Sequence, residues 1–191
     1  MISANRVRSL LLVGASVLLC ASGFAIPAAR AQAPPLAPSQ VVKTQTYVSL
    51  APVPRGKDFE VAVVVDIHAA YHMNSHKPSE AYLIPTTLTP KLPEGITLLD
   101  TSYPAGHTKK FSFSDNPLNV YAGKVTLKLK LSAGEKAPLG ETTIPITLRY
   151  QACNESACLP PVKIPIEAQL KIAAAGAEAH ATHAEIFTPG E

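Results

Sequence analysis

Two cysteines on either side of a short turn constrain this chain more than any other feature. Cys153 and Cys158 lie in the stretch YQACNESACLPP, residues 150–161, with four residues between them. Apolar and polar side chains alternate in residues 144–150, and the alternation resumes in residues 162–166. Such period-two alternation is typical of half-buried strands. The sequence therefore predicts an antiparallel hairpin that turns between the cysteines.

Directly opposed residues of such a hairpin are close enough for a disulfide. The Cα atoms of a non-hydrogen-bonded antiparallel pair are about 4.5 Å apart, within the range that a disulfide accepts. We therefore expect Cys153 to bond Cys158, with Cys153 on the polar face of its strand. As a staple, a loop this short contributes only about 2 kcal/mol in the chain-entropy model. From the residues alone, a structural disulfide and a redox-active one both stay open.

The hydrophobic pattern also predicts the register of the returning strand. If pairing continued regularly from the two cysteines, Ile164 would lie opposite Thr147 and the apolar faces of the strands would disagree. One extra residue between Cys158 and Val162 brings Ile164 opposite Leu148 instead. We expect a β-bulge there, where two consecutive prolines have no N–H to donate to the ladder.

The N-terminus has the pattern of a secretory signal peptide. Arg6 and Arg8 precede an apolar run at residues 10–26, and the small-residue site Ala29-Arg-Ala31 follows. Cleavage after Ala31 is expected, which makes residues 1–31 the signal peptide. An uncleaved anchor is the alternative, because the apolar run is close to the lower limit for spanning a membrane.

Removal of residues 1–31 changes both the cysteine count and the charge. Cys20 is lost, so three cysteines become one pair, which suits an oxidising compartment. Three arginines and no acid are lost, which brings Lys+Arg from 17 down to the 14 of Asp+Glu. The sequence therefore predicts an exported protein of balanced charge, with no nucleic-acid partner.

Short β-rich segments fill the rest of the chain. Seven strands are predicted, at residues 43–50, 59–68, 81–89, 96–103, 125–131, 144–153 and 162–172. Seven strands without an amphipathic helix predict an all-β fold, a β-sandwich, as one domain at residues 41–172. A proline-rich linker at 32–40 precedes this domain, and a disordered low-complexity tail at 173–191 is expected after it.

Three histidines, His68, His72 and His76, recur at every fourth residue. On a helix this spacing would form a metal-binding face. The local sequence is that of a strand followed by a loop, so the three imidazoles are expected to point in different directions. We therefore predict no metal site, and the sequence also contains no nucleophile motif and no phosphate-binding glycine loop.

Four stretches resemble, in order, the N-terminal periplasmic domain of the thiol:disulfide interchange protein DsbD. They are residues 71–78 (YHMNSHKP), 82–86 (YLIPT), 120–124 (VYAGK) and 150–161, and the resemblance spans about residues 41–170. It implies an immunoglobulin-like β-sandwich in the periplasm whose catalytic pair, Cys153 and Cys158, exchanges disulfides without a metal or organic cofactor. It also implies a cap loop over the pair, here Leu118, Val120 and Tyr121, with Val120 where the best-known members carry an aromatic.

The resemblance also implies partners. Full-length family members continue into a membrane-embedded electron transporter and a thioredoxin-like domain, so here we expect a separate membrane electron transporter and thioredoxin-like periplasmic proteins. In the family the second cysteine carries the mixed disulfide, which makes Cys158 the attacking sulfur and Cys153 the resolving one. The best-known members space the cysteines by five residues instead of four. An exported binding or assembly module with an inert hairpin disulfide remains the alternative function.

Overall fold

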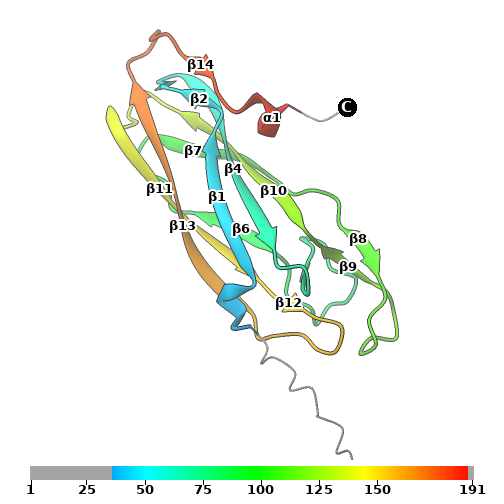
Figure 1. The fold of residues 1–191 in the computed structure, drawn as a ribbon. Helices are drawn as coiled ribbons and strands as arrows, with labels where there is room; N and C mark the ends of the chain where they lie inside the picture. The colour runs from blue at the N-terminus through cyan, green and yellow to red at the C-terminus, as the bar shows by residue number, and fades with distance from the viewer. Residues whose placement is uncertain (1–35, 189–191) are drawn as a thin grey trace, which may run out of the picture. The chain divides into compact units, whose positions relative to one another are not determined.

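The computed structural model describes residues 36–188, and almost all of its regular elements are strands (Figure 1). The predicted signal peptide lies outside the described residues. The strands are β1 (Val42–Val48), β2 (Leu50–Ala51), β3 (Val53–Pro54), β4 (Lys57–Ile67), β5 (His72–Asn74), β6 (Thr87–Pro90), β7 (Ile96–Ser102), β8 (His107–Lys109), β9 (Leu118–Tyr121), β10 (Lys124–Ala133), β11 (Gly140–Tyr150), β12 (Ala152–Cys153), β13 (Val162–Ala173) and β14 (His180–Ala181). Two short helices, η1 (Pro38–Gln40) and α1 (Ala184–Phe187), lie near the ends of the described chain.

Two four-stranded sheets pack face to face as an immunoglobulin-like β-sandwich, which confirms the predicted fold class. Their strand orders are β1-β4-β10-β7 and β3-β13-β11-β6. Every second residue of the long strands points inward, because successive side chains of a strand face opposite sides of the sheet. The apolar core residues contributed by β10 and β11 are Leu127, Leu129, Leu131, Ala133, Ile144, Ile146, Leu148 and Tyr150.

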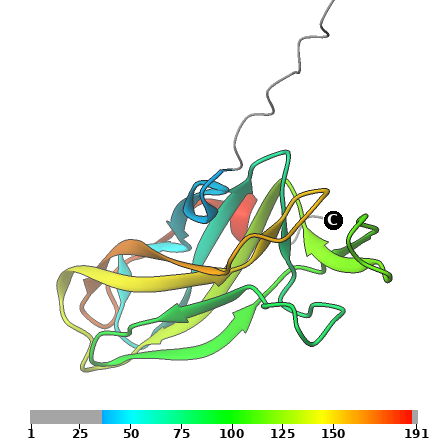
Figure 2. The same cartoon turned by 90° about the horizontal axis from the view of Figure 1, so that it is seen from below.

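A third sheet of very short strands, in the order β12-β5-β9-β8, lies at one end of the sandwich (Figure 1). β12 follows β11 after a break at Gln151 and carries the first cysteine of the pair. Figure 2 views the molecule from below and shows the cysteine turn and the β8–β9 hairpin projecting on the same side. We call β8, β9 and the loop between them, residues 110–117, the cap hairpin.

The predicted register of the cysteine hairpin is confirmed. Leu148 pairs with Ile164, and the ladder keeps this register to the last residue of β11. The two cysteines pair with each other one residue out of that register, so the returning arm holds one extra residue before β13 begins. Ile164 is half-buried and packs against the core, as an inward-facing residue should.

The predicted strand at residues 81–89 is wrong over most of its length, because only β6 forms there. Residues 81–86 form a loop whose polar groups make hydrogen bonds to the side chain of Gln151 and to the backbone of β5. The N–H of Ile84 donates to Gln151 Oε1 at 3.1 Å, and the hydroxyl of Thr86 donates to the carbonyl of Asn74 at 2.6 Å. In this segment, hydrogen bonds to these groups take the place of the backbone hydrogen bonds of a β-ladder.

Both flanks of the predicted domain contain more structure than expected. In the segment predicted as a disordered tail, β14 pairs with β2, and the N–H of Thr182 donates to the carbonyl of Ser49 at 2.9 Å. In the predicted linker, Leu36 packs against the core and its N–H donates to Tyr71 Oη at 3.1 Å. Within residues 36–188, no helix has the length and apolar character needed to cross a membrane.

Candidate functional site

Cys153 and Cys158 form a disulfide, as predicted, with an S–S distance of 1.99 Å and a Cα–Cα distance of 3.9 Å. Asn154 closes the turn between them. Its N–H donates to the carbonyl of Ala157, and its Oδ1 accepts the N–H groups of Ser156 and Ala157, all at 2.9 Å. Asparagine stabilises turns in this way because its short side chain reaches the backbone two residues ahead. The expected four-residue turn is therefore present.

The two sulfur-bearing residues differ in exposure. Cys153 has 0% of its surface exposed, whereas Cys158 is half-buried. The prediction that Cys153 lies on a polar strand face is wrong, because β11 ends at Tyr150 and its alternation ends with it. β12 joins the third sheet instead, where Cys153 pairs with His72 of β5. Cys158 is therefore the sulfur nearer to solvent.

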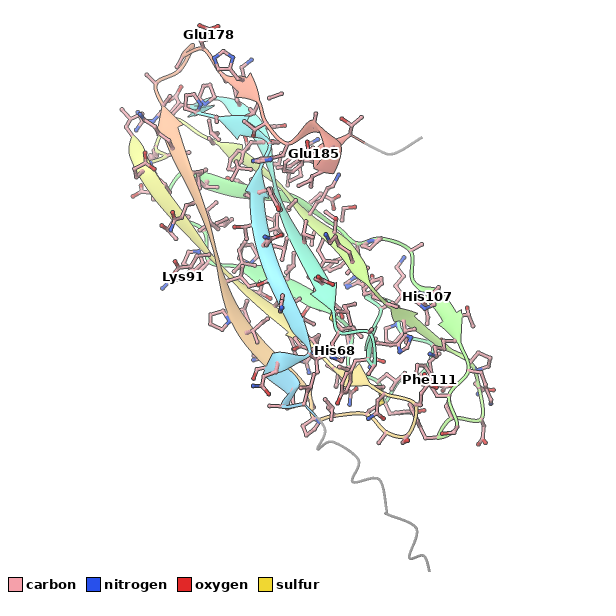
Figure 3. All side chains as sticks on the ribbon, in the orientation of Figure 1. His68, Lys91, His107, Phe111, Glu178 and Glu185 are labelled. Atoms are coloured by element: carbon pink, nitrogen blue, oxygen red, sulfur yellow. A yellow bond between two sulfur atoms is a disulfide. The ribbon has the colours of Figure 1, made fainter. Side chains whose placement is uncertain are left out.

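A small apolar cluster packs against Cys158 and is separate from the main core. Its buried members are Leu83, Phe111, Leu118 and Val120. Phe111 is 1% exposed, and its ring meets the ring of His72 edge-on at a centroid distance of 5.4 Å. Figure 3 labels Phe111 at the end of the molecule that carries β8 and β9. The cluster covers the more exposed cysteine.

The sequence pattern did not predict a role for Phe111 at the disulfide, although Phe111 is the aromatic residue of this cluster. The only signal was the pair Phe111 and Phe113 in an otherwise polar segment, which has no strand or helix period. The two rings pack at a centroid distance of 5.2 Å. Phe111 therefore contributes to the cover an aromatic ring that Val120 does not provide.

The three residues expected in the cap have different surroundings. Leu118 and Val120 belong to the cluster against Cys158, whereas Tyr121 belongs to the main core. The Tyr121 hydroxyl donates to the carbonyl of Pro104 at 3.0 Å and accepts the N–H of His76 at 3.1 Å. Burial raises the pKa of Tyr121, so it remains a neutral donor. Tyr121 anchors the base of the cap hairpin.

Charged and polar groups join the cap hairpin to the cysteine turn. Lys109 Nζ lies 2.6 Å from Glu155 Oε1, and the hydroxyl of Ser112 donates to the carbonyl of Glu155 at 2.7 Å. The hydrogen bond from Lys109 lowers the pKa of Glu155. These contacts hold the segment that carries Phe111 beside the disulfide.

His72 lies between the cap hairpin and the disulfide. Burial lowers its pKa from 6.5, and the charge of Lys109 lowers it further, against the opposing effect of Glu155. Lys109 Nζ is 3.1 Å from His72 Nε2. Because an ammonium group only donates, Nε2 is the acceptor and the neutral ring carries its proton on Nδ1. Within residues 36–188, Nδ1 is buried and has no hydrogen-bond partner.

The lowered pKa of His72 makes stability depend on pH. The unfolded chain binds a proton at His72 more readily than the folded protein does, so stability is complete above about pH 6.5 and is lost as the pH falls through the folded pKa. We expect the free energy of unfolding to decrease between pH 7.5 and pH 5 more in the wild type than in His72→Gln. Urea unfolding at both pH values measures this difference, and equal pH dependence in the two proteins would contradict it.

The other histidines of the predicted four-residue spacing have separate surroundings. His68 is exposed after β4, and His76 stacks on Tyr103 with ring centroids 3.7 Å apart and an interplanar angle of 1°. In the part of the chain that the structure describes, no group of three potential metal-ligating side chains occurs.

Comparisons with known proteins place the chain in a family. Residues 33–169 match the family described as "Thiol:disulfide interchange protein DsbD, N-terminal", and no curated protein matches the chain. Among solved structures, the N-terminal periplasmic domain of ScsB from Proteus mirabilis is 9% identical with a TM-score of 0.48, covering 71% of this chain and 49% of that one. AggA, the major subunit of aggregative adherence fimbriae type I from Escherichia coli, is 9% identical with a TM-score of 0.31, covering 69% of this chain and 95% of that one.

The chain thus spans about half the length of the ScsB structure. The family match, in contrast, extends over both sheets apart from the end of β13, and over the whole third sheet with its disulfide. Because this match covers well over half of the chain, the protein belongs to the DsbD N-terminal domain family.

Proposed function

We propose that this protein exchanges disulfides in the periplasm and passes electrons between partner proteins through Cys153 and Cys158. The observation that supports this most is the position of the disulfide, which lies in a small sheet at the end of the sandwich beneath a separate apolar cover. A disulfide there closes a very short loop, so it adds little to the free energy of unfolding. Family membership favours the same role.

The proposed exchange proceeds through a mixed disulfide. A thiolate of a reduced dithiol partner attacks Cys158 Sγ, the S–S bond breaks, and Cys153 leaves with the electron pair and takes up a proton. The second thiolate of the partner then attacks the partner's own sulfur in the mixed disulfide and releases Cys158. The partner is oxidised by two electrons and the pair is reduced. In the reverse direction, Cys158 attacks an acceptor disulfide and Cys153 resolves the intermediate.

The proposed partners follow from this chemistry. A separate membrane electron transporter is the electron donor, and thioredoxin-like periplasmic proteins are the acceptors, because both present the dithiol or disulfide that the exchange requires. Access to Cys158 requires the cap hairpin to move away from the cysteine turn. Export through cleavage of residues 1–31 would deliver the protein to the compartment where such partners occur.

A second candidate function is an exported binding or assembly module with an inert disulfide. The full burial of Cys153 favours this candidate, because a buried, covered disulfide is protected from reductants.

The reduction potential of the Cys153/Cys158 couple distinguishes the two candidates. We expect the potential to lie well above about −300 mV, the value below which structural disulfides usually fall. The mature protein is equilibrated with defined ratios of reduced and oxidised glutathione, and the free thiols are alkylated and counted by mass. A potential below that value would assign the disulfide a structural role.

A further inference from the structure

Two buried polar side chains of β5 flank Cys153, and the exchange steps above use neither. Cys153 pairs directly with His72, so their side chains lie on the same face of the third sheet with Cβ atoms about 4.5–5.5 Å apart. Asn74, two residues further along β5, points to the same face. Asn74 is 0% exposed and His72 is 9% exposed, so protein groups must supply most of their hydrogen bonds.

The orientation of the Asn74 amide is set by its neighbours. Its Nδ2 donates to the carbonyl of Ile84 at 3.2 Å and to Gln151 Oε1 at 3.1 Å. Gln151 is itself held in place, because its Nε2 donates to the carbonyl of Leu159 at 3.2 Å. A flipped Asn74 would place its oxygen against two acceptors. Oδ1 therefore points at Cys153 Sγ, 4.0 Å away.

Neither polar atom gains a hydrogen bond from the disulfide. A disulfide sulfur carries no proton, so Cys153 donates nothing to Asn74 Oδ1 in the oxidised protein. His72 Nε2 accepts the hydrogen bond from Lys109, so the ring proton is on Nδ1. Within residues 36–188, this Nδ1–H has no acceptor. Asn74 Oδ1 is thus a buried acceptor beside Cys153 Sγ, and His72 Nδ1 is a buried donor on the residue that pairs with Cys153. In the part of the chain that the structure describes, neither atom has a hydrogen-bond partner in the oxidised state, which costs free energy.

We infer that Asn74 and His72 together favour the reduced form of Cys153 and so raise the reduction potential of the pair. Reduction by a dithiol adds two electrons and two protons, breaks the S–S bond and leaves a thiol at each cysteine. The S–H of Cys153 then donates to Asn74 Oδ1, and its sulfur accepts the Nδ1–H of His72. Both unpaired atoms gain partners in the reduced state only. This inference deepens the proposed function and rests on it for its biological role.

Three variants test the inference. Asn74→Ala removes the acceptor, and His72→Phe keeps a ring against Phe111 but removes the donor. His72→Asn is the matched control, because its amide nitrogen is as many bonds from Cα as Nδ1 is, while the contact with Lys109 is lost in both His72 variants. We expect Asn74→Ala and His72→Phe to shift the equilibrium with glutathione about tenfold toward the disulfide, which corresponds to about 30 mV. His72→Asn should stay near the wild-type equilibrium.

Unfolding of both redox forms separates this role from a merely structural one. Asn74→Ala and His72→Phe should destabilise the reduced protein more than the oxidised protein in urea, by the same factor as the glutathione shift. Equal destabilisation of both forms, or an unchanged glutathione equilibrium, would overturn the inference. If Asn74→Ala does not fold, the comparison of the two His72 variants decides alone. The wild-type potential tests the proposed function separately, because these shifts are differences from the wild type whatever its value.

Discussion

Cys153→Ala will accumulate mixed disulfides with partner proteins through Cys158, whereas Cys158→Ala will accumulate almost none. Cys158 is half-buried and Cys153 is fully buried, so a partner sulfur reaches Cys158 first. Without Cys153 no internal thiol resolves the intermediate, which therefore persists. Non-reducing electrophoresis of periplasmic extracts, followed by mass spectrometry of the new bands, measures this trapping.

Two controls make this experiment decisive. The double variant, which lacks both thiols, gives the background of non-covalent association. Ser156→Ala changes an exposed residue of the same turn whose side chain is not part of the turn's hydrogen bonds, and it should trap no more than the wild type. Equal trapping by the two cysteine variants, or stronger trapping by Cys158→Ala, would refute the assignment of Cys158 as the attacking sulfur.

Phe111→Ala will speed the reduction of the disulfide by dithiothreitol about tenfold or more. Phe111 is the largest side chain in the cluster against Cys158, and replacing a buried phenylalanine with alanine costs about 3–5 kcal/mol in a well-packed site. Only about 1.4 kcal/mol of this loss needs to act on the opening of the cap hairpin to give a tenfold change. Stopped alkylation at intervals after addition of dithiothreitol measures the rate.

A matched core variant separates local opening from global unfolding. Leu131→Ala removes a fully buried side chain near the end of β10 farthest from the cap hairpin, and it should cost about 2–5 kcal/mol. Its disulfide should be reduced at nearly the wild-type rate under conditions where both variants remain folded. If Leu131→Ala accelerates reduction as much as Phe111→Ala, the protection comes from global stability and not from the cover.

The apolar cover and the polar side chains of β5 act on different quantities. Phe111 packs on the side of Cys158 and limits how fast a reductant reaches the sulfur. Asn74 and His72 lie beside Cys153 and stabilise its thiol more than its disulfide, so they act on the equilibrium between the reduced and oxidised forms. Variants of the first kind should change rates with little change in potential, and variants of the second kind should change the potential.

The all-β class, the cysteine turn and the register of β13 could all be predicted from the amino-acid sequence. These are local properties, because period-two alternation shows which face of a strand is buried, and four residues are too few to separate two cysteines widely. The extra residue between Cys158 and Val162 was predicted by matching the apolar faces of the two strands. The structure contains this extra residue and pairs Leu148 with Ile164.

The surroundings of the two sulfurs could not be predicted from the sequence, because they depend on contacts between distant segments. Cys153 is buried because β12 leaves the sheet of β11 and pairs with β5. β5 is distant in the sequence, since its last residue, Asn74, lies 79 residues before Cys153. Phe111 and Lys109 reach the site from the cap hairpin, whose strands are three and four residues long. Strands this short carry too few side chains to show a period, and they form only where a folded sandwich offers them a neighbour to pair with. The cover and the polar contacts of the disulfide therefore depend on long-range pairing that no local pattern encodes.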